Sequence, residues 1–165
     1  MSTASARLVV DSPLGRLTFE GDDDALTHLH LPNTGMARRG SSDGPPPRPL
    51  QDAARQLDEY FAGERVSFTL PLRPEGTAFQ LEVWWALDTI PYGQTVSYAE
   101  LADRVGRPRA FRAVGQANGA NPLAIVLPCH RVVASGGGLG GYGGGLAVKR
   151  RLLALEGATL GATVT

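Results

Sequence analysis

Two capping boxes predict where helices begin in the second half of the chain. Thr77 is followed by Gln80, and Ser97 is followed by Glu100. At this spacing each side chain satisfies a backbone N–H that has no partner inside the helix. The apolar residues after Thr77 recur at helical spacing, and they are Phe79, Val83, Trp84, Leu87 and Ile90. The second half is therefore expected to be mostly helical, with Trp84 in its core.

A further short helix is expected after the one that Ser97 opens. Gly106 ends the helix that follows Ser97, and Pro108 can occupy the first turn of the next one. That helix would point Ala110, Ala113, Val114 and Ala117 inward, and Arg109 and Arg112 outward. Two short helices joined in this way have the proportions of a helix-turn-helix, although many helical hairpins bind nothing.

The first half has the pattern of a small strand-and-helix unit. Residues 6–31 form short alternating runs separated by turn residues, and residues 50–61 follow helical spacing until Gly63. Residues 66–70 alternate as one more strand, and residues 33–49 form a polar, proline-rich loop. His28 and His30 would share one strand face, as two metal ligands would. No cysteine or acid stands at ligand spacing beside them along the chain, so no metal site is expected.

The expected fold class is α+β with two domains. A small domain of strands and a helix would cover residues 1–72, and a mostly helical domain with a helix-turn-helix, winged-helix-like, would cover residues 77–165. The N-terminus lacks a secretory pattern, no apolar run is long enough to cross a membrane, and one cysteine suits a reducing compartment. These features predict a cytoplasmic protein without a membrane partner.

Charge is distributed unevenly, although the formal net charge is zero. Residues 101–151 hold eight of the sixteen basic residues and one of the sixteen acids, Asp103. The basic residues there are Arg104, Arg107, Arg109, Arg112, Arg131, Lys149, Arg150 and Arg151. This asymmetry indicates that the second half of the chain meets a polyanion.

The chain's single cysteine, Cys129, lies between Pro128 and His130 in the run "LPCHRVV". A lone cysteine is most often a small buried hydrophobe, but with a histidine and a carboxylate in reach it can be a nucleophile. Residues 123–127 are expected to form a buried strand that leads to Cys129. Residues 136–145 contain eight glycines and lack the lysine and hydroxyl of a P-loop, which favours a loop whose backbone approaches a flat ligand.

The sequence around Cys129 resembles the methylated-DNA–protein-cysteine methyltransferases. The resemblance is carried by "PCHRV" at 128–132, "NP" at 121–122, "YGGGL" at 142–146 and "IPYG" at 90–93, and it extends over residues 79–157. The first half resembles the family's more variable domain only in outline. The resemblance implies direct, stoichiometric transfer of an alkyl group from the 6-oxygen of guanine in DNA to Cys129, with no cofactor. Some family members carry an extra metal site, but the single cysteine here excludes one built through cysteines, so no metal is expected.

The resemblance also implies the chemical roles at the thiol. A soft thiolate is suited to attack at carbon, provided that its pKa is lowered. His130 would take the thiol proton through a water, and Glu156 would orient His130, in the manner of a hydrolase triad. Asn121 would brace the turn that holds Cys129. Without the resemblance, the plainer interpretation of Glu156 is an ordinary solvated acid, and that of Asn121 is a residue that ends a helix in a turn.

Further residues are implied to bind the flipped nucleotide. Tyr98 would hold guanine N3 and crowd the phosphate into rotation, and Arg112 would fill the space left in the base stack. The carbonyls of Cys129 and Val132 would accept from the guanine amino group, and a backbone N–H near Tyr142 and Gly143 would donate to the 6-oxygen. The plainer alternatives are a core tyrosine at Tyr98 and phosphate neutralisation by Arg112.

Two other function classes stay open from the sequence. A cysteine hydrolase could use Cys129, His130 and Glu156, and it would regenerate its thiol at every turnover. A non-catalytic DNA-binding regulator is the second, although relatives of that kind lack the cysteine. The expected partner is double-stranded DNA containing 6-O-alkylguanine. Action on 4-O-alkylthymine and clustering of this expected monomer on DNA are both left open.

Overall fold

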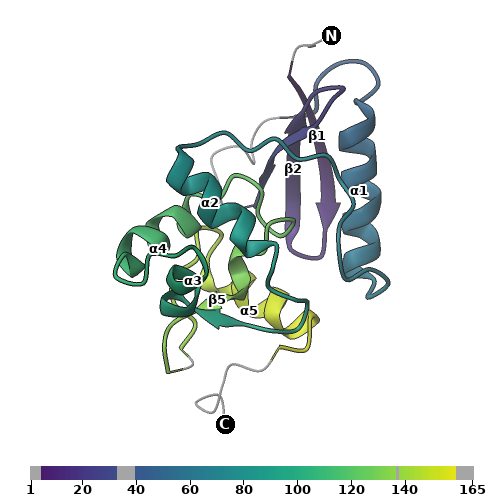
Figure 1. Cartoon of the computed structure of the whole chain (residues 1–165). Coiled ribbons are helices and arrows are strands. Elements are labelled where there is room, and N and C mark those ends of the chain that lie inside the picture. Colours follow the sequence, from purple (N-terminus) through teal and green to yellow (C-terminus); the bar gives the residue numbers. More distant parts are fainter. Residues whose placement is uncertain (1–4, 33–39, 137, 159–165) are drawn as a thin grey trace. The chain divides into compact units, whose positions relative to one another are not determined.

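The structure is a computed structural model, and it describes residues 5–32, 40–136 and 138–158 (Figure 1). The chain divides into two compact units. The first comprises Met1–Glu75 and the short segment Pro122–Val126, and the second comprises Gly76–Asn121 and Leu127–Thr165. Strands with one long helix make up the first unit, and helices dominate the second, which confirms the expected α+β class.

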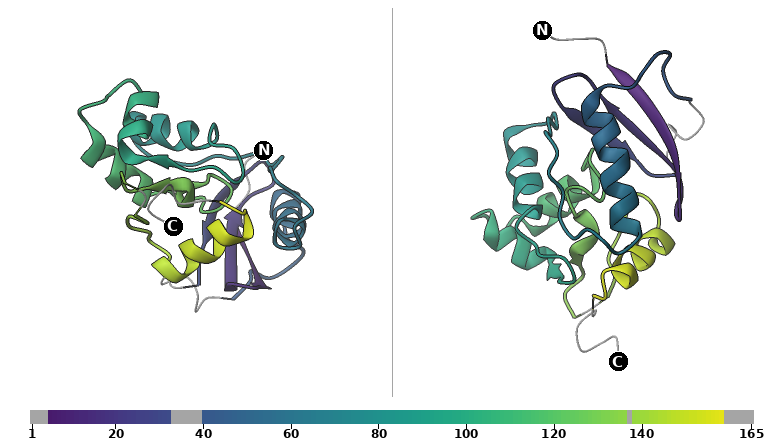
Figure 2. Two further views of the ribbon diagram at one scale, coloured as in Figure 1. Left: turned by 90° about the horizontal axis from the view of Figure 1, so that it is seen from below. Right: turned by 90° about the vertical axis from the view of Figure 1, so that its right-hand side faces the viewer.

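The first unit is a three-stranded antiparallel sheet with one helix. Strands β1 (Ala6–Ser12), β2 (Gly15–Gly21) and β3 (Leu26–His30) pair in that order. Helix α1 (Arg48–Phe61) lies across one face of the sheet (Figure 2, right). The buried side chains of Leu17, Phe19, Leu29 and Leu57 fill the space between them. The three strand predictions and the helix prediction are confirmed.

Two predicted strands are not formed. Residues 66–70 have no sheet partner among the described residues, and the chain pairs only afterwards, through a bridge between Leu26 and Leu72. Residues 123–127 are buried as predicted, yet only Leu123 makes a bridge, to Leu29. The positive φ of 71° at Ile125 turns the backbone out of an extended path, so the apolar run at residues 123–127 reflects burial and not a strand.

The second unit is built around helices α2 (Ala78–Leu87), α3 (Tyr98–Arg104) and α4 (Phe111–Gly119). Both predicted capping boxes are formed, at Thr77 and at Ser97. Trp84 is 2% exposed, and its indole Nε1 donates to the carbonyl of Ala117 at 2.7 Å. This bond joins α2 to the end of α4, which confirms the prediction that Trp84 is a core residue.

The connection between α3 and α4 is longer than the sequence predicts. Helix α4 begins at Phe111, so Pro108 lies in the connecting turn and not in the helix. Backbone bonds from Arg107 to Ala102 and from Ala110 to Arg107 close this turn before the helix starts. Ala113, which is predicted to point inward, is exposed, while Val114 and Ala117 are buried.

The rest of the second unit surrounds Cys129. A 3₁₀ turn, η2 (Cys129–Arg131), runs into β5 (Val132–Val133), which pairs in parallel with β4 (Val96–Ser97). Helix α5 (Leu146–Leu155) packs beside η2. No helix within the described ranges is long and apolar enough to cross a membrane.

Replacing Trp84 should therefore destabilise the protein far more than replacing its neighbour. Trp84→Phe removes the indole donor and leaves the buried Ala117 carbonyl without it, which costs about 1–3 kcal/mol. Trp85 is 44% exposed, so Trp85→Phe should change the free energy of unfolding by no more than about 0.5 kcal/mol. Urea denaturation of both variants measures the difference, and equal losses would contradict the assigned core.

Candidate active site

Two asparagine side chains hold the turn that carries Cys129. Pro128 precedes the turn, and the Cys129 N–H donates back to the carbonyl of Leu127 at 2.8 Å. Asn121 donates from Nδ2 to that same carbonyl at 2.7 Å, and Asn118 donates from Nδ2 to the carbonyl of Cys129 at 3.4 Å. Asn118 is buried and was not singled out by the sequence. The turn is therefore anchored to the end of α4.

Glu156 is the centre of a buried ionic network. Its Oε2 lies 2.8 Å from His130 Nε2. Arg131 binds the same carboxylate with two nitrogens, Nε to Oε1 at 2.8 Å and Nη2 to Oε2 at 2.9 Å, and donates from Nη1 to the carbonyl of Ile90 at 2.7 Å. The Glu156 side chain is 0% exposed. The alternative interpretation of Glu156 as a solvated acid is therefore wrong.

The network fixes the tautomer of His130. A carboxylate accepts hydrogen bonds, so the imidazole proton resides on Nε2, and Nδ1 carries the lone pair. Nδ1 has no hydrogen-bond partner in the described part of the chain. Burial lowers the pKa of His130, and this outweighs the opposing effect of Glu156. A buried, neutral imidazole with a basic nitrogen one residue from a thiol can act as a general base.

The thiol of Cys129 is held in its neutral form in the free protein. Burial raises its pKa, while a hydrogen bond from Asn121, the charge of Lys149 and a hydrogen bond with Tyr142 act in the opposite direction. The lowered pKa that thiolate attack requires is therefore not present in the free protein, because desolvation dominates. Attack by this sulfur requires that its proton be removed at the time of reaction.

Lys149 is an interior residue that sequence reasoning placed on the surface. Its Nζ donates to the carbonyls of Val132 at 2.7 Å and Gly141 at 3.1 Å, and it lies 6.0 Å from the centre of the Tyr142 ring. Burial lowers the pKa of Lys149 to about 8, against an opposing effect of Cys129.

Two of the eight basic residues assigned to a polyanion surface are thus internal, Arg131 and Lys149. Lys149 stands three and four residues before the buried Leu152 and Leu153, so helical spacing alone could have placed it on the inward face of α5.

Tyr98 lies against the glycine-rich loop. It is the first residue of α3, half-buried, and its hydroxyl donates to the carbonyl of Gly141 at 3.4 Å. Gly140 has a φ of 72°, and a Cβ there would come within 2.8 Å of the Tyr98 hydroxyl. Glycine is therefore required for the loop to approach the ring. At Gly143 a Cβ would meet only the carbonyl of Gly119, at 3.8 Å, so the reason for glycine there is not steric.

The structure brings most of the predicted site residues into one cluster. Asn121, Tyr142 and the charge of Lys149 all lower the pKa of Cys129, and burial raises the pKa of Tyr98 with a smaller contribution from Cys129. His130 and Glu156 are bonded to each other, and the Val132 carbonyl accepts from Lys149. Arg112 is apart from this buried cluster, exposed near the start of α4.

The other six basic residues of the segment 101–151 are exposed, and they are Arg104, Arg107, Arg109, Arg112, Arg150 and Arg151. Phe111, which is 48% exposed, and Ala113 flank Arg112, so the start of α4 presents a cation beside apolar surface.

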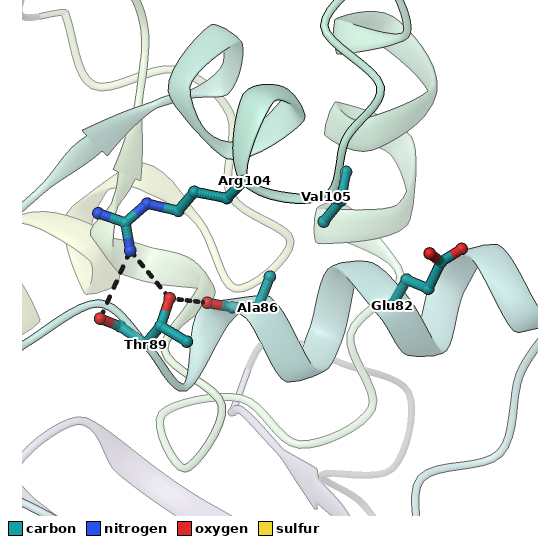
Figure 3. Close-up of a pocket in the computed structure, with 5 residues that line it drawn as sticks. All are labelled: Glu82, Ala86, Thr89, Arg104 and Val105. Atoms are coloured by element: carbon teal, nitrogen blue, oxygen red, sulfur yellow. Dashed lines mark hydrogen bonds between the residues drawn. The ribbon is translucent and has the colours of Figure 1, made fainter.

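A separate hollow of about 510 Å³ lies between α2 and α3 (Figure 3). Arg104 donates across it from Nη1 to the Thr89 hydroxyl at 2.8 Å, and that hydroxyl donates to the carbonyl of Ala86. Neither a thiol nor a histidine lines this hollow, and it is distinct from the Cys129 cluster.

Comparison with known proteins gives two family matches that together cover most of the chain. Residues 7–74 match the 6-O-methylguanine DNA methyltransferase, ribonuclease-like domain. Residues 78–158 match the 6-O-methylguanine DNA methyltransferase, DNA binding domain.

Individual relatives agree. The chain is 52% identical over 149 residues to the methylated-DNA–protein-cysteine methyltransferase of Mycolicibacterium paratuberculosis, covering 89% of each chain. It is 44% identical over 152 residues to the constitutive enzyme of Bacillus subtilis, covering 88% of this chain and 92% of that one. The crystal structure of Mycobacterium tuberculosis OGT in complex with DNA matches with a TM-score of 0.83 and 47% identity, over 96% of this chain and 98% of that one. The chain therefore belongs to the methylated-DNA–protein-cysteine methyltransferases.

Proposed function

We propose that the protein repairs DNA by transferring an alkyl group from the 6-oxygen of guanine to Sγ of Cys129. In this step an S–C bond forms and the C–O bond to guanine breaks. The thiol proton passes through a water to Nδ1 of His130. Guanine leaves as its anion and regains the ordinary amide form when a proton, returned from His130 through water or taken from solvent, reaches the base. The observation that carries the proposal is a buried thiol at Cys129 followed directly in the chain by a buried, neutral imidazole whose Nε2 is held by Glu156.

The product of this step is a thioether, which explains why each protein molecule reacts only once. A thioether at Cys129 has no proton to return and no bond that His130 could hydrolyse, so each molecule repairs one lesion. Glu156 positions the base, and Asn121 positions the turn through the carbonyl of Leu127. The positive charge of Lys149 favours the thiolate while the proton is on His130.

DNA is the partner of this family, and we propose how this chain reads the lesion. The target oxygen is inaccessible in a stacked duplex, so the nucleotide is flipped out, with Arg112 entering the vacated stack and Tyr98 contacting guanine N3. The exposure of Arg112 and the position of Tyr98 against the glycine-rich loop support these roles.

The base edge itself is read by backbone groups in this proposal. The carbonyls of Cys129 and Val132 accept from the guanine amino group, and a backbone N–H at Tyr142 or Gly143 donates to the 6-oxygen. The Val132 carbonyl already accepts from Lys149, and its second lone pair serves the base.

Several finer features belong to the same proposal. Residues 77–165, with the α3–α4 pair as helix-turn-helix, carry both DNA binding and transfer, and residues 1–72 form a separate N-terminal domain. The protein acts as a monomer that can cluster on DNA, and 4-O-alkylthymine is a second substrate to be tested. A cytoplasmic, reducing location suits a reaction that consumes a free thiol.

Intact mass after reaction tests the transfer most simply. Incubation with duplex DNA containing 6-O-methylguanine should add one methyl group per molecule, mapped to Cys129, and repair should stop at one equivalent. Cys129→Ser should bind the lesion and transfer nothing, because an alcohol is a far weaker nucleophile than a thiolate. Several repaired lesions per protein, with the thiol regenerated, would contradict the proposal and favour a cysteine hydrolase.

Arg112 can be distinguished from a residue that only neutralises phosphate. Arg112→Ala should slow repair of a matched duplex far more than transfer from the free alkylated base, which needs no flipping. A mismatch opposite the lesion should partly restore the rate, because extrusion then costs less.

Arg109→Ala is the matched control, since Arg109 is also exposed but lies in the turn before α4. Loss of one phosphate contact should weaken binding to damaged and undamaged DNA alike and reduce the salt slope by about one. Transfer rates at saturating DNA would be compared for matched duplex, mismatched duplex and free base. Equal losses with Arg112→Ala on all three substrates would show that Arg112 does not enter the stack.

A further inference from the structure

The sheet of the first unit brings two histidines and a carboxylate together. Glu20 on β2 stands directly opposite His28 on β3, and His30 is two residues further along the same strand. His30 Nε2 is 2.8 Å from Glu20 Oε1, and His28 Nδ1 is 3.5 Å from the same oxygen. The acid that sequence spacing did not provide comes from the neighbouring strand.

The three side chains are held in place yet open to solvent. Their side chains are 18%, 39% and 21% exposed for Glu20, His28 and His30 respectively. The two imidazole rings are parallel within 7°, with centroids 5.2 Å apart. Because strand pairing fixes the backbone at Glu20, His28 and His30, binding a ligand would cost little conformational entropy in ordering these residues.

The donor set and its spacing fit a small divalent ion. One ligand atom from each residue lies within 4.8 Å of the other two. Bonds of about 2.0–2.2 Å to nitrogen and carboxylate oxygen would draw these atoms together by a modest side-chain rotation. Imidazole nitrogen with one carboxylate favours ions of the zinc type over magnesium or calcium. Water would complete the coordination.

Neighbouring groups are compatible with a cation here. Burial lowers the pKa of His28, while Glu20 and Glu75 act to raise it and His30 to lower it, so Glu75 adds negative potential at the cluster. Arg7, opposite Glu20 on β1, directs its Nε to the carbonyl of Gly40. The His28 Nδ1 contact with Thr27 Oγ1, at 3.0 Å, is the one that coordination through Nδ1 would replace.

We propose that Glu20, His28 and His30 form a binding site for one divalent transition-metal ion of the zinc class, joining β2 to β3. The site is separate from Cys129 and is independent of the alkyl-transfer proposal. Its consequence is stability of the first unit, because an ion that binds only the folded state stabilises it by mass action.

The test is calorimetric titration of the metal-stripped, full-length protein with Zn²⁺. Cys129→Ser serves as the parent, since thiolates also bind zinc. The parent should saturate at one equivalent and its melting temperature should rise with Zn²⁺. His28→Gln, His30→Gln and Glu20→Gln should each weaken binding at least about 10- to 100-fold. Glu64→Gln, an exposed acid in the same unit, should not.

Circular dichroism checks that each variant is folded. Because three ligand residues are replaced separately, the test still works if one of the variants does not fold. Titration with Mg²⁺ should give no saturable binding at the concentrations at which Zn²⁺ saturates. The proposal is overturned if the parent binds no Zn²⁺, if the folded ligand variants bind it as tightly as the parent, or if Mg²⁺ binds equally well.

Discussion

The carboxylate of Glu156 determines the geometry of the reactive site. It accepts from His130 and from two nitrogens of Arg131, and all three side chains are buried. An uncompensated charge in such a place costs about 3–5 kcal/mol, so neither ionic partner can be removed without strain on the fold. Glu156 caps α5, and His130 and Arg131 belong to the Cys129 turn. The bonds between Glu156 and these two residues therefore connect the end of α5 to the turn.

The ion pair of Arg131 and Glu156 also explains the sequence of the turn at residues 90–93. The Ile90 carbonyl accepts from Arg131, and the Tyr92 ring covers the guanidinium at 5.7 Å. Gly93 has a φ of 81°, and a Cβ there would be 3.1 Å from the backbone oxygen of Glu156. Ile90 and Tyr92 position Arg131, which binds the Glu156 carboxylate, and this carboxylate in turn positions the His130 imidazole.

Burial gives this protein a thiol that is inactive until it is needed. Desolvation keeps Cys129 protonated and His130 neutral in the free protein. A permanently ionised cysteine would be open to oxidation, which would waste a molecule that acts once. The nearby charge of Lys149, with its pKa of about 8, favours the thiolate once the proton has moved.

Local sequence patterns predicted local structure well and failed where tertiary packing decides. Capping boxes, the alternation at residues 6–31 and the helix before Gly63 are local signals, and the predicted elements are formed, whereas the alternation at residues 66–70 is not a strand. The strand predicted at residues 123–127 is not formed. An apolar run indicates burial, but it does not reveal the positive φ at Ile125 that turns the backbone. Arg131 and Lys149 look like surface cations because composition carries no sign of a buried partner.

The most direct test of this account is the protonation state of His130, observed by long-range ¹H–¹⁵N correlation spectra across a pH titration. The account predicts a neutral imidazole with its proton on Nε2 at neutral pH, titrating below the ordinary range for histidine, because burial lowers its pKa. Glu156→Gln, which keeps the size of the side chain, should disturb the tautomer. A proton on Nδ1, or an imidazolium ion at neutral pH, would contradict the claim that Glu156 holds His130 ready to accept the Cys129 proton.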